Sequence, residues 1–270
     1  MIKQAIIPLA GLGTRLLPLT SVFAKELLPI NGKPGLEYII EECIEAGIKE
    51  IVFIISKKKL MIKKYFYNDK FYKDIIKKKN DPKIIKEYKK ILKYKKMIKF
   101  VFQDKPLGTG DAVYKTKKFI TDKYFLMLLP DDLIIKKNCS KSMIAVHNKF
   151  KASVMASMKV NKNDVSRWGI YNIRKKIDKN NFIINNVVEK PSIKTSPSNN
   201  AVIGRYILPK TIFSKLKSLK PGKSGEFHIT DAIQALIEDD NQFIGHNFSG
   251  KYLDCGTMKG YIKSTLEISK

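Results

Sequence analysis

Hydrophobic and polar positions alternate in blocks along the first half of the chain. Four of the blocks are short apolar runs closed by a glycine, a proline or a polar turn, and their length is that of strands. Their unbroken hydrophobicity is typical of strands that are covered on both faces of a parallel sheet. These runs are Lys3–Leu9, Ile51–Ile55, Met97–Gln103 and Tyr124–Pro130.

Segments whose apolar residues have the spacing of a helix lie between these runs. After Pro34, apolar residues recur every three or four positions, and Gly47 stands where a helix C-cap is expected. A further helix is expected over residues 111–119, between the third and fourth runs. Strands that alternate with helices predict an open parallel sheet with right-handed crossovers.

The pattern changes in the second half, where strand-like segments follow one another with only polar turns between them. A helix near residues 140–150 comes first, and a strand pair is expected near residues 243–248. Further helices are expected over 209–219, 230–238 and 258–267. We therefore predict a single α/β domain over residues 1–270. Its core is a Rossmann-like open mixed, mostly parallel sheet flanked by helices, with an α+β second half.

Composition excludes several classes of protein. The chain is 44% hydrophobic, which suits a normal buried core. No stretch approaches the roughly 20 apolar residues of a membrane span, and the chain enters its first strand without a basic leader. We expect a soluble, cytoplasmic protein with no membrane partner. Cys43, Cys139 and Cys255 are too scattered for a disulfide framework or a zinc site, so we interpret them as reduced thiols.

The formal charge of +27 suggests a nucleic-acid binder, but the distribution of the charge argues against that class. Only four of the 52 basic residues are arginine, the side chain that nucleic-acid readers exploit. Between residues 57 and 99, eighteen lysines face four acidic residues. We interpret this segment as a solvated, lysine-coated helical insertion, and a polyanion-binding surface is the alternative.

A glycine loop, Ala10-Gly11-Leu12-Gly13-Thr14-Arg15, follows the first apolar run. Gly11 and Gly13 let the backbone approach a nucleotide closely, although the spacing is neither that of a dinucleotide fingerprint nor that of a P-loop. Arg15 and, ten residues later, Lys25 are cations that suit a triphosphate. The alternative is that both are ordinary exposed side chains.

Further polar groups follow other strands, where ligands bind in open α/β sheets. Asp131 and Asp132 close the fourth run, and one carboxylate there suffices for Mg²⁺, although either could instead cap the next segment. The pair Glu189-Lys190 offers an acceptor for sugar hydroxyls beside a cation for phosphate. Gln103 and the glycines of residues 106–110 suit the edge of a base, or form a plain turn.

Nucleophilic catalysis finds no support in the sequence. The three histidines stand outside any serine or cysteine motif, so we interpret them as surface or packing residues. They are His147, His228 and His246.

Together these motifs strongly resemble the bacterial UTP–glucose-1-phosphate uridylyltransferases, within the nucleoside-diphosphate-sugar pyrophosphorylases. The resemblance covers nearly the whole chain. Its elements, in order, are IIPLAGLGTRLLPLT, KELLPINGKP, QDKPLGTGDAV, LLPDDL, WGI, VVEKP, PSNNAVIGRYIL, GEFHITDAI and YLDCG. The first, second and fourth are shared widely by sugar nucleotidyltransferases. The uridylyl group is favoured by PLGTG within the third element, by the PSNNAVIGRYIL block, by the TDAI helix start and by DCG.

The resemblance implies a Mg²⁺-assisted in-line attack of glucose 1-phosphate on UTP, in a homodimer or homotetramer without a specific nucleic-acid partner. Residues 1–135 would be mainly nucleotide-binding, and residues 136–270 mainly sugar-binding and oligomerising. The implied site residues are Ala10, Gly11, Gln103 and Gly108 for the base and ribose, Arg15 and Lys25 for the triphosphate, Asp131 and Asp254 for the metal, Gly169 and Glu189 for the sugar, and Lys190 for its phosphate. Gly13 joins the nucleotide-binding set through its place in the glycine loop.

Two rival activities within the same fold stay open: a thymidylyltransferase acting on the same sugar phosphate, and a catalytically silent regulatory paralogue. Silent paralogues tend to lose the Thr-Arg of the glycine loop, which is intact here. The chain departs from the family pattern at Ser21, Ala24 and Asp111, where a lysine, a proline and a histidine are usual. These departures bear on kinetic details more than on the reaction.

Overall fold

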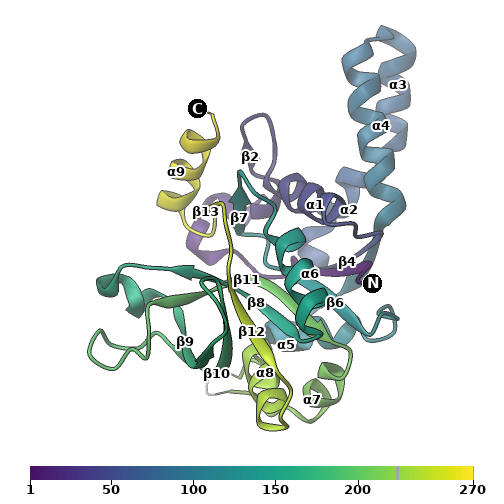
Figure 1. The fold of residues 1–270 in the computed structure, drawn as a ribbon. Helices are drawn as coiled ribbons and strands as arrows, with labels where there is room; N and C mark the ends of the chain where they lie inside the picture. The colour runs from purple at the N-terminus through teal and green to yellow at the C-terminus, as the bar shows by residue number, and fades with distance from the viewer. Residues whose placement is uncertain (223–224, 270) are drawn as a thin grey trace.

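A nine-stranded mixed sheet forms the centre of the computed structural model, which describes residues 1–222 and 225–269 (Figure 1). Residues 223, 224 and 270, which the single-domain prediction includes, lie outside the described residues. The strand order is β5-β4-β1-β6-β11-β8-β12-β10-β9. These strands are β1 Gln4–Pro8, β4 Glu50–Ile55, β5 Ile98–Phe102, β6 Tyr124–Leu128, β8 Ser153–Lys159, β9 Gly169–Lys176, β10 Asn181–Glu189, β11 Asn200–Pro209 and β12 Phe243–Asn247.

Two small ribbons and the helices complete the fold. The ribbons pair β2 Pro29–Ile30 with β3 Lys33–Pro34, and β7 Asp132–Ile135 with β13 Lys251–Asp254. The α-helices are α1 Gly35–Glu45, α2 Leu60–Tyr67, α3 Asp69–Lys79, α4 Pro82–Met97, α5 Gly108–Lys115, α6 Cys139–Phe150, α7 Ile212–Ser218, α8 Ile229–Glu238 and α9 Met258–Ile268. Short 3-10 helices include η1 Thr14–Leu16, η3 Lys25–Leu27 and η5 Lys162–Arg167.

Four strands of the first half, β5, β4, β1 and β6, are parallel to one another, as their helical connections require. Strand β11 then pairs antiparallel with β6 and β8, whereas β12 lies parallel to β8. Strands β9 and β10 form an antiparallel hairpin at the edge. The mixed α/β sheet expected from the sequence is confirmed.

Each face of the sheet has its own hydrophobic core. Along β1, Ala5 and Ile7 point to the face covered by α1, α2, α4 and α6, while Ile6 points to the face covered by α5, α7 and α8. All three residues are fully buried. The continuous apolar runs in the sequence are therefore the consequence of burial on both sides.

Helix α1 shows how local sequence fixes an element. Pro34 occupies its N-cap position, and Gly47 follows its end with φ +87°, a conformation that glycine adopts without steric cost. The Gly47 amide donates to the Ile44 carbonyl and the Ile48 amide to the Cys43 carbonyl, both at 3.0 Å. This is the hydrogen-bond pattern of a Schellman motif.

Three local expectations need correction. The helix expected over 111–119 begins three residues earlier, because Gly108 belongs to its first turn. The strand pair expected near residues 243–248 is a single strand, β12, whose partners β8 and β10 come from elsewhere in the chain. Strands β7 and β13 were not expected, since a short two-stranded ribbon leaves no periodic signal.

The lysine-rich segment contains α2, α3 and α4, and the last two project from the body as a helical arm (Figure 1). Helix α3 has no buried residue. Tyr72 and Tyr88 stack across the arm with ring centroids 5.1 Å apart. Lys59 is an exception to the prediction that the lysines of this segment are solvated, because it is only 7% exposed.

Two further sequence interpretations concern the chain as a whole. Cys43, Cys139 and Cys255 are all free thiols, as expected. Among the described residues, no helix combines the length and the apolar character that a membrane crossing needs.

Candidate active site

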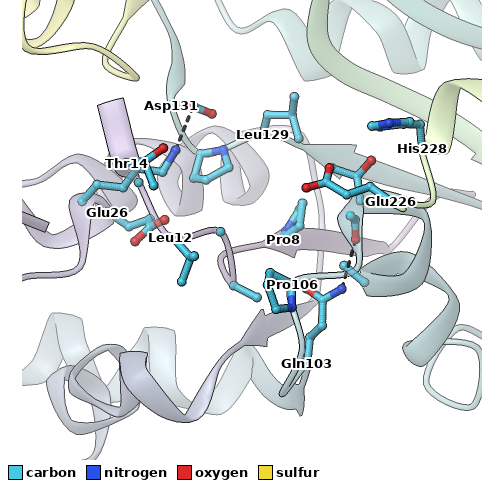
Figure 2. A pocket seen from close by; sticks show the side chains of 18 residues that line it. Pro8, Leu12, Thr14, Glu26, Gln103, Pro106, Leu129, Asp131, Glu226 and His228 are labelled. Atoms are coloured by element: carbon cyan, nitrogen blue, oxygen red, sulfur yellow. Dashed lines mark hydrogen bonds and ion pairs between the residues drawn. The ribbon is translucent and has the colours of Figure 1, made fainter. Parts of the chain in front are cut away.

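A cavity of about 440 Å³ opens at the carboxyl ends of β1 and β6 (Figure 2). Thr14 and Asp131 lie on one side of it, and Glu226 and His228 on the other. Seven of the residues proposed from the sequence line it: Ala10, Gly11, Gly13, Lys25, Gln103, Gly108 and Asp131. The strand-end rule therefore located this cavity correctly.

The glycine loop forms one wall of the cavity. Gly13 has φ +70°, and a Cβ on it would lie 3.0 Å from Cγ2 of Thr20. Glycine is therefore required there by both backbone conformation and space. A Cβ on Gly11 would meet nothing within 4 Å, so the backbone at Gly11 faces open space. A ligand can approach the loop closely at that point.

Three charged side chains meet beside this loop. Lys25 Nζ lies 2.8 Å from Asp131 Oδ2, and the Arg15 guanidinium lies 3.3 Å from the same oxygen. The Lys25 and Asp131 side chains are 14% and 19% exposed, whereas Arg15 is 64% exposed. Arg15 is therefore free to reorient toward a ligand, while Lys25 is held in place.

The electrostatics of the cluster keep its members charged. Burial opposes the charge on Lys25, but Asp131 and Glu26 outweigh it, so the pKa of Lys25 lies above its usual value. Burial likewise opposes the charge on Asp131, but Lys25 outweighs it and holds the pKa of that carboxyl below its usual value. At neutral pH the site presents both a carboxylate and a fixed ammonium.

Asp132, the neighbour of Asp131, has a structural task. Burial, and then the charge of Asp131, raise the pKa of Asp132 to about 6. Its Oδ2 accepts from the Gly204 amide at 2.8 Å, and its Oδ1 accepts from the Tyr252 hydroxyl at 2.7 Å. Asp132 thus anchors β11 and β13, which leaves Asp131 as the carboxylate that faces the cavity.

Asp254 reaches the cluster through the β7–β13 ribbon. Asp254 pairs with Asp132 in that ribbon, and the Cys255 amide donates to the Asp131 carbonyl at 2.8 Å. A Cβ on Gly256 would lie 2.7 Å from Arg15 Nη2, 2.8 Å from Asp131 Oδ2 and 3.2 Å from Asp254 Oδ1. The two carboxylates and Arg15 therefore meet beside a position that only a glycine leaves open.

This pair of carboxylates fits a hard divalent cation. Magnesium takes one or two protein carboxylates and completes its octahedron with phosphate oxygens and water. Among the described residues, no group of three or more metal-ligating side chains gathers, so an all-protein metal cage is absent from that part of the chain. The donor set is that of a cation bound together with its phosphate ligand.

Gln103, in the loop after β5, and Gly108, the first residue of α5, both line the cavity. The Gln103 side chain donates to the Gly108 carbonyl at 3.0 Å and to Asp111 Oδ2 at 2.8 Å. Gly108 has φ +92°, and a Cβ on it would lie 2.6 Å from the Phe227 carbonyl. The glycines of this loop are needed for that close contact, so the loop is more than a plain turn.

Glu189 and Lys190 line a second cavity, of about 810 Å³, which shares Thr109, Leu129 and His228 with the first. Lys190 Nζ lies 3.5 Å from Glu189 Oε1, and both side chains are more than 60% exposed. Gly169 pairs with Glu189 across β9 and β10, and a Cβ on it would lie 3.1 Å from Glu189 Oε2. The two cavities are contiguous.

Sequence reasoning missed Glu226 and His228 as lining residues. They reach the cavity because the Phe227 amide donates to the Leu107 carbonyl at 2.8 Å, while the Phe227 carbonyl accepts from the Gly110 amide at 2.7 Å. His228 was interpreted as a surface or packing residue, whereas it borders both cavities. The only sequence signal for these positions was the motif GEFHITDAI.

A buried ion pair beneath the site was also missed. The Lys59 ammonium contacts both carboxylate oxygens of Glu26 at 2.7 and 2.8 Å. Burial lowers the pKa of Lys59, and Glu26 only partly offsets that effect. The pair ties the start of the lysine-rich segment to η3, the short helix that carries Lys25.

Arg205, on β11, is the largest fully buried side chain in the described part of the protein. Its guanidinium forms a two-pronged contact with Glu42 and donates to the carbonyls of Leu129 and Asp132 at 3.1 and 2.6 Å. Burial would lower the pKa of Arg205, but Glu42 outweighs it and raises that pKa further above its usual value. Arg205 therefore holds the backbone on both sides of Asp131 in place through hydrogen bonds.

The parallel sheet, the glycine loop and the charged cluster at its strand ends define a nucleotide-binding transferase site. The nucleotidyl transferase family model matches residues 4–270, so the chain belongs to that family.

Within the family, several of its relatives are named uridylyltransferases. It is 37% identical to UTP–glucose-1-phosphate uridylyltransferase 2 of Staphylococcus saprophyticus, over 98% of this chain and 91% of that protein. A UDP-glucose pyrophosphorylase complexed with UDP-glucose superposes with a TM-score of 0.87 at 33% identity, over 100% of this chain and 99% of the other. A UTP-bound enzyme of the same type from Acinetobacter baumannii gives 0.89 at 31%, over 99% and 93%.

Proposed function

We propose that the protein makes UDP-glucose and pyrophosphate from UTP and glucose 1-phosphate. The observation that carries this proposal is the position of Asp131, Lys25 and Arg15 beside a cavity that opens directly onto a second one with Glu189 and Lys190 at its wall. Two contiguous cavities suit two substrates, and a cationic cluster suits the phosphates that must meet. The names of the uridylyltransferase relatives support the choice of substrates.

In this reaction a phosphate oxygen of glucose 1-phosphate attacks the α-phosphorus of UTP. The bond from that phosphorus to the β-phosphate oxygen breaks, and pyrophosphate leaves with the electron pair. The attacking oxygen is already anionic, so no general base is needed. Catalysis then consists of positioning and of neutralising charge, which suits a site built from cations, a carboxylate and glycine amides.

We assign roles by position. Ala10, Gly11, Gln103 and Gly108 would hold the base and ribose, and Gly13 would help to bind the nucleotide, since all five line the first cavity. Arg15 and Lys25 would grip the triphosphate. Gly169 and Glu189 would contact the sugar, and Lys190 its phosphate.

We propose that Asp131 and Asp254 hold Mg²⁺ when the nucleotide is bound. The bound cation would neutralise phosphate charge in the transition state. Lys25 has the complementary task of keeping Asp131 ionised and in place, because its ammonium lies 2.8 Å from Oδ2.

Gly256→Ala tests this metal assignment. The new Cβ would lie 2.7 Å from Arg15 Nη2, 2.8 Å from Asp131 Oδ2 and 3.2 Å from Asp254 Oδ1, so Arg15 and Asp131 would have to shift and the arrangement of the two carboxylates would change. We expect the magnesium concentration for half-maximal activity to rise by on the order of tenfold. Gly35→Ala is the control, because Gly35 lacks a left-handed backbone and the nearest atom to its new Cβ would lie 3.4 Å away, an ordinary contact. An unchanged magnesium requirement in the Gly256 variant would exclude Asp254 as a ligand.

Pyrophosphate release with each nucleoside triphosphate in turn, in the presence of glucose 1-phosphate and magnesium, tests the activity itself. We expect UTP to give the highest kcat/KM, with UDP-glucose as the product detected by chromatography. A much higher value with dTTP would identify a thymidylyltransferase. Absence of turnover with every nucleotide would identify a silent paralogue.

We further propose that the enzyme is a cytoplasmic homodimer or homotetramer, as its resemblance to the family implies. Light scattering of the purified protein in solution measures the assembly size. A monomer at micromolar concentration would contradict this proposal.

A further inference from the structure

The Gln103 side chain is only 4% exposed, and it forms part of the wall of the first cavity. Its backbone amide donates to the Ile55 carbonyl at 2.9 Å, which fixes the residue at the end of β5. The side-chain nitrogen makes two hydrogen bonds, whereas no hydrogen bond to its Oε1 is formed by the described residues. An acceptor that no described residue pairs with is therefore carried by a side chain of the cavity wall (Figure 2).

The two hydrogen-bond partners of the Gln103 side chain show whether its NH₂ group or its carbonyl oxygen faces the protein. The Gly108 carbonyl can only accept a hydrogen bond, and a carboxylate such as that of Asp111 is likewise an acceptor. Both lie within 3.0 Å of the same end of the Gln103 amide, so that end must be the NH₂ group. The opposite orientation would place a carbonyl oxygen against two acceptors.

We propose that Asp111 is a positioning residue that holds the Gln103 carbonyl toward the base and so selects uracil over cytosine. This inference rests on the proposed binding of a pyrimidine nucleotide in the first cavity. Uracil carries a hydrogen on N3 that Gln103 Oε1 can accept, whereas N3 of cytosine is itself an acceptor. Cytosine would leave two unpaired acceptors facing each other, which is costly in a buried site.

The location of Asp111 suits this task. It lies in the first turn of α5, where the helix dipole favours a carboxylate. Its side chain is 16% exposed, it does not line the cavity itself, and its other charged partner, Lys115, is 3.7 Å away. Asp111 therefore acts on the base only through Gln103.

Equilibrium binding of UTP and of CTP to the full protein, by isothermal titration calorimetry with magnesium, tests the inference. For wild type we expect tighter binding of UTP. Asp111→Leu keeps a similar shape but removes the acceptor, so the ratio of the two Kd values should fall by at least about tenfold. Asp111→Asn retains an acceptor oxygen and should keep the ratio within about threefold of wild type.

Lys115→Gln is the matched control, because it removes the other partner of Asp111 and should leave the ratio unchanged. A folding defect would weaken the binding of both nucleotides together, so it cannot mimic a change in their ratio. If Asp111→Leu does not fold, Asp111→Ala takes its place.

The inference is overturned if wild type binds UTP and CTP equally, or if the acceptor-free variant keeps the wild-type ratio. Failure of the proposed function has a different signature, namely selective UTP binding without formation of UDP-glucose.

Discussion

Replacing Asp131 with asparagine is expected to lower kcat for UDP-glucose synthesis by about a hundredfold, the equivalent of ~3 kcal/mol of transition-state stabilisation. The substitution keeps the shape of the side chain but removes its negative charge. It takes one carboxylate from the proposed metal pair, and it leaves the ammonium of Lys25 without its 2.8 Å partner. Steady-state kinetics at saturating UTP and glucose 1-phosphate measure the effect.

Two controls separate this loss from a general defect. Asp74→Asn removes an equivalent charge on the exposed surface of α3 and should retain full activity. Thermal melting of Asp131→Asn shows whether the variant remains folded at the assay temperature. A folded Asp131 variant with near wild-type turnover would refute the role given to this carboxylate.

Arg205→Met is expected to lower the free energy of unfolding by about 3–5 kcal/mol, because it leaves the charge of Glu42 buried without its partner. Arg205 is fully buried and Glu42 is 6% exposed, so water cannot replace the lost contacts. The substitution also removes donors to the carbonyls of Leu129 and Asp132, which flank Asp131. Urea unfolding followed by circular dichroism measures the change.

An exposed arginine provides the matched control. Arg167 is 67% exposed and lies 3.6 Å from Asp164, so Arg167→Met should cost less than about 1 kcal/mol. Adding Glu42→Gln to Arg205→Met removes the stranded charge and should recover part of the lost stability. Equal losses for the two arginines would show that burial of the Glu42–Arg205 pair has no special weight.

The sequence predicted those parts of the fold in which local pattern and burial agree. Runs such as Ile51–Ile55 are apolar on both faces because both faces of β4 are covered, and α1 carries its own start and stop signals. The β7–β13 ribbon, and β12 in place of the expected strand pair, depend on pairing between distant segments. No local pattern encodes such pairing, so these elements were missed or misassigned.

The candidate site divides in the same way. Asp131 and Gln103 follow strands at the sheet edge where ligands bind, and Lys25 belongs to the long connection after β1, so their position was predictable. Glu226 and His228 enter through backbone contacts with the loop at residues 107–110, and Arg205 looked like any basic residue on a strand. A buried, ion-paired arginine such as Arg205 cannot be distinguished from an exposed one by the residues next to it in the sequence.

We expect the helical arm to be more sensitive to ionic strength than the cavities at the sheet edge. Within residues 57–99, the described lysines that contact a carboxylate are Lys57, Lys59, Lys90, Lys95 and Lys99, and Lys63 lies over the Tyr67 ring. Repulsion between lysine charges reaches about 30 Å in 0.01 M salt but only about 8 Å in 0.15 M. Helix α3 has no buried residue and is joined to α4 by the Tyr72–Tyr88 stack and by the contacts of Asp69, so we expect the arm to loosen before the cavities at the sheet edge change as salt is withdrawn.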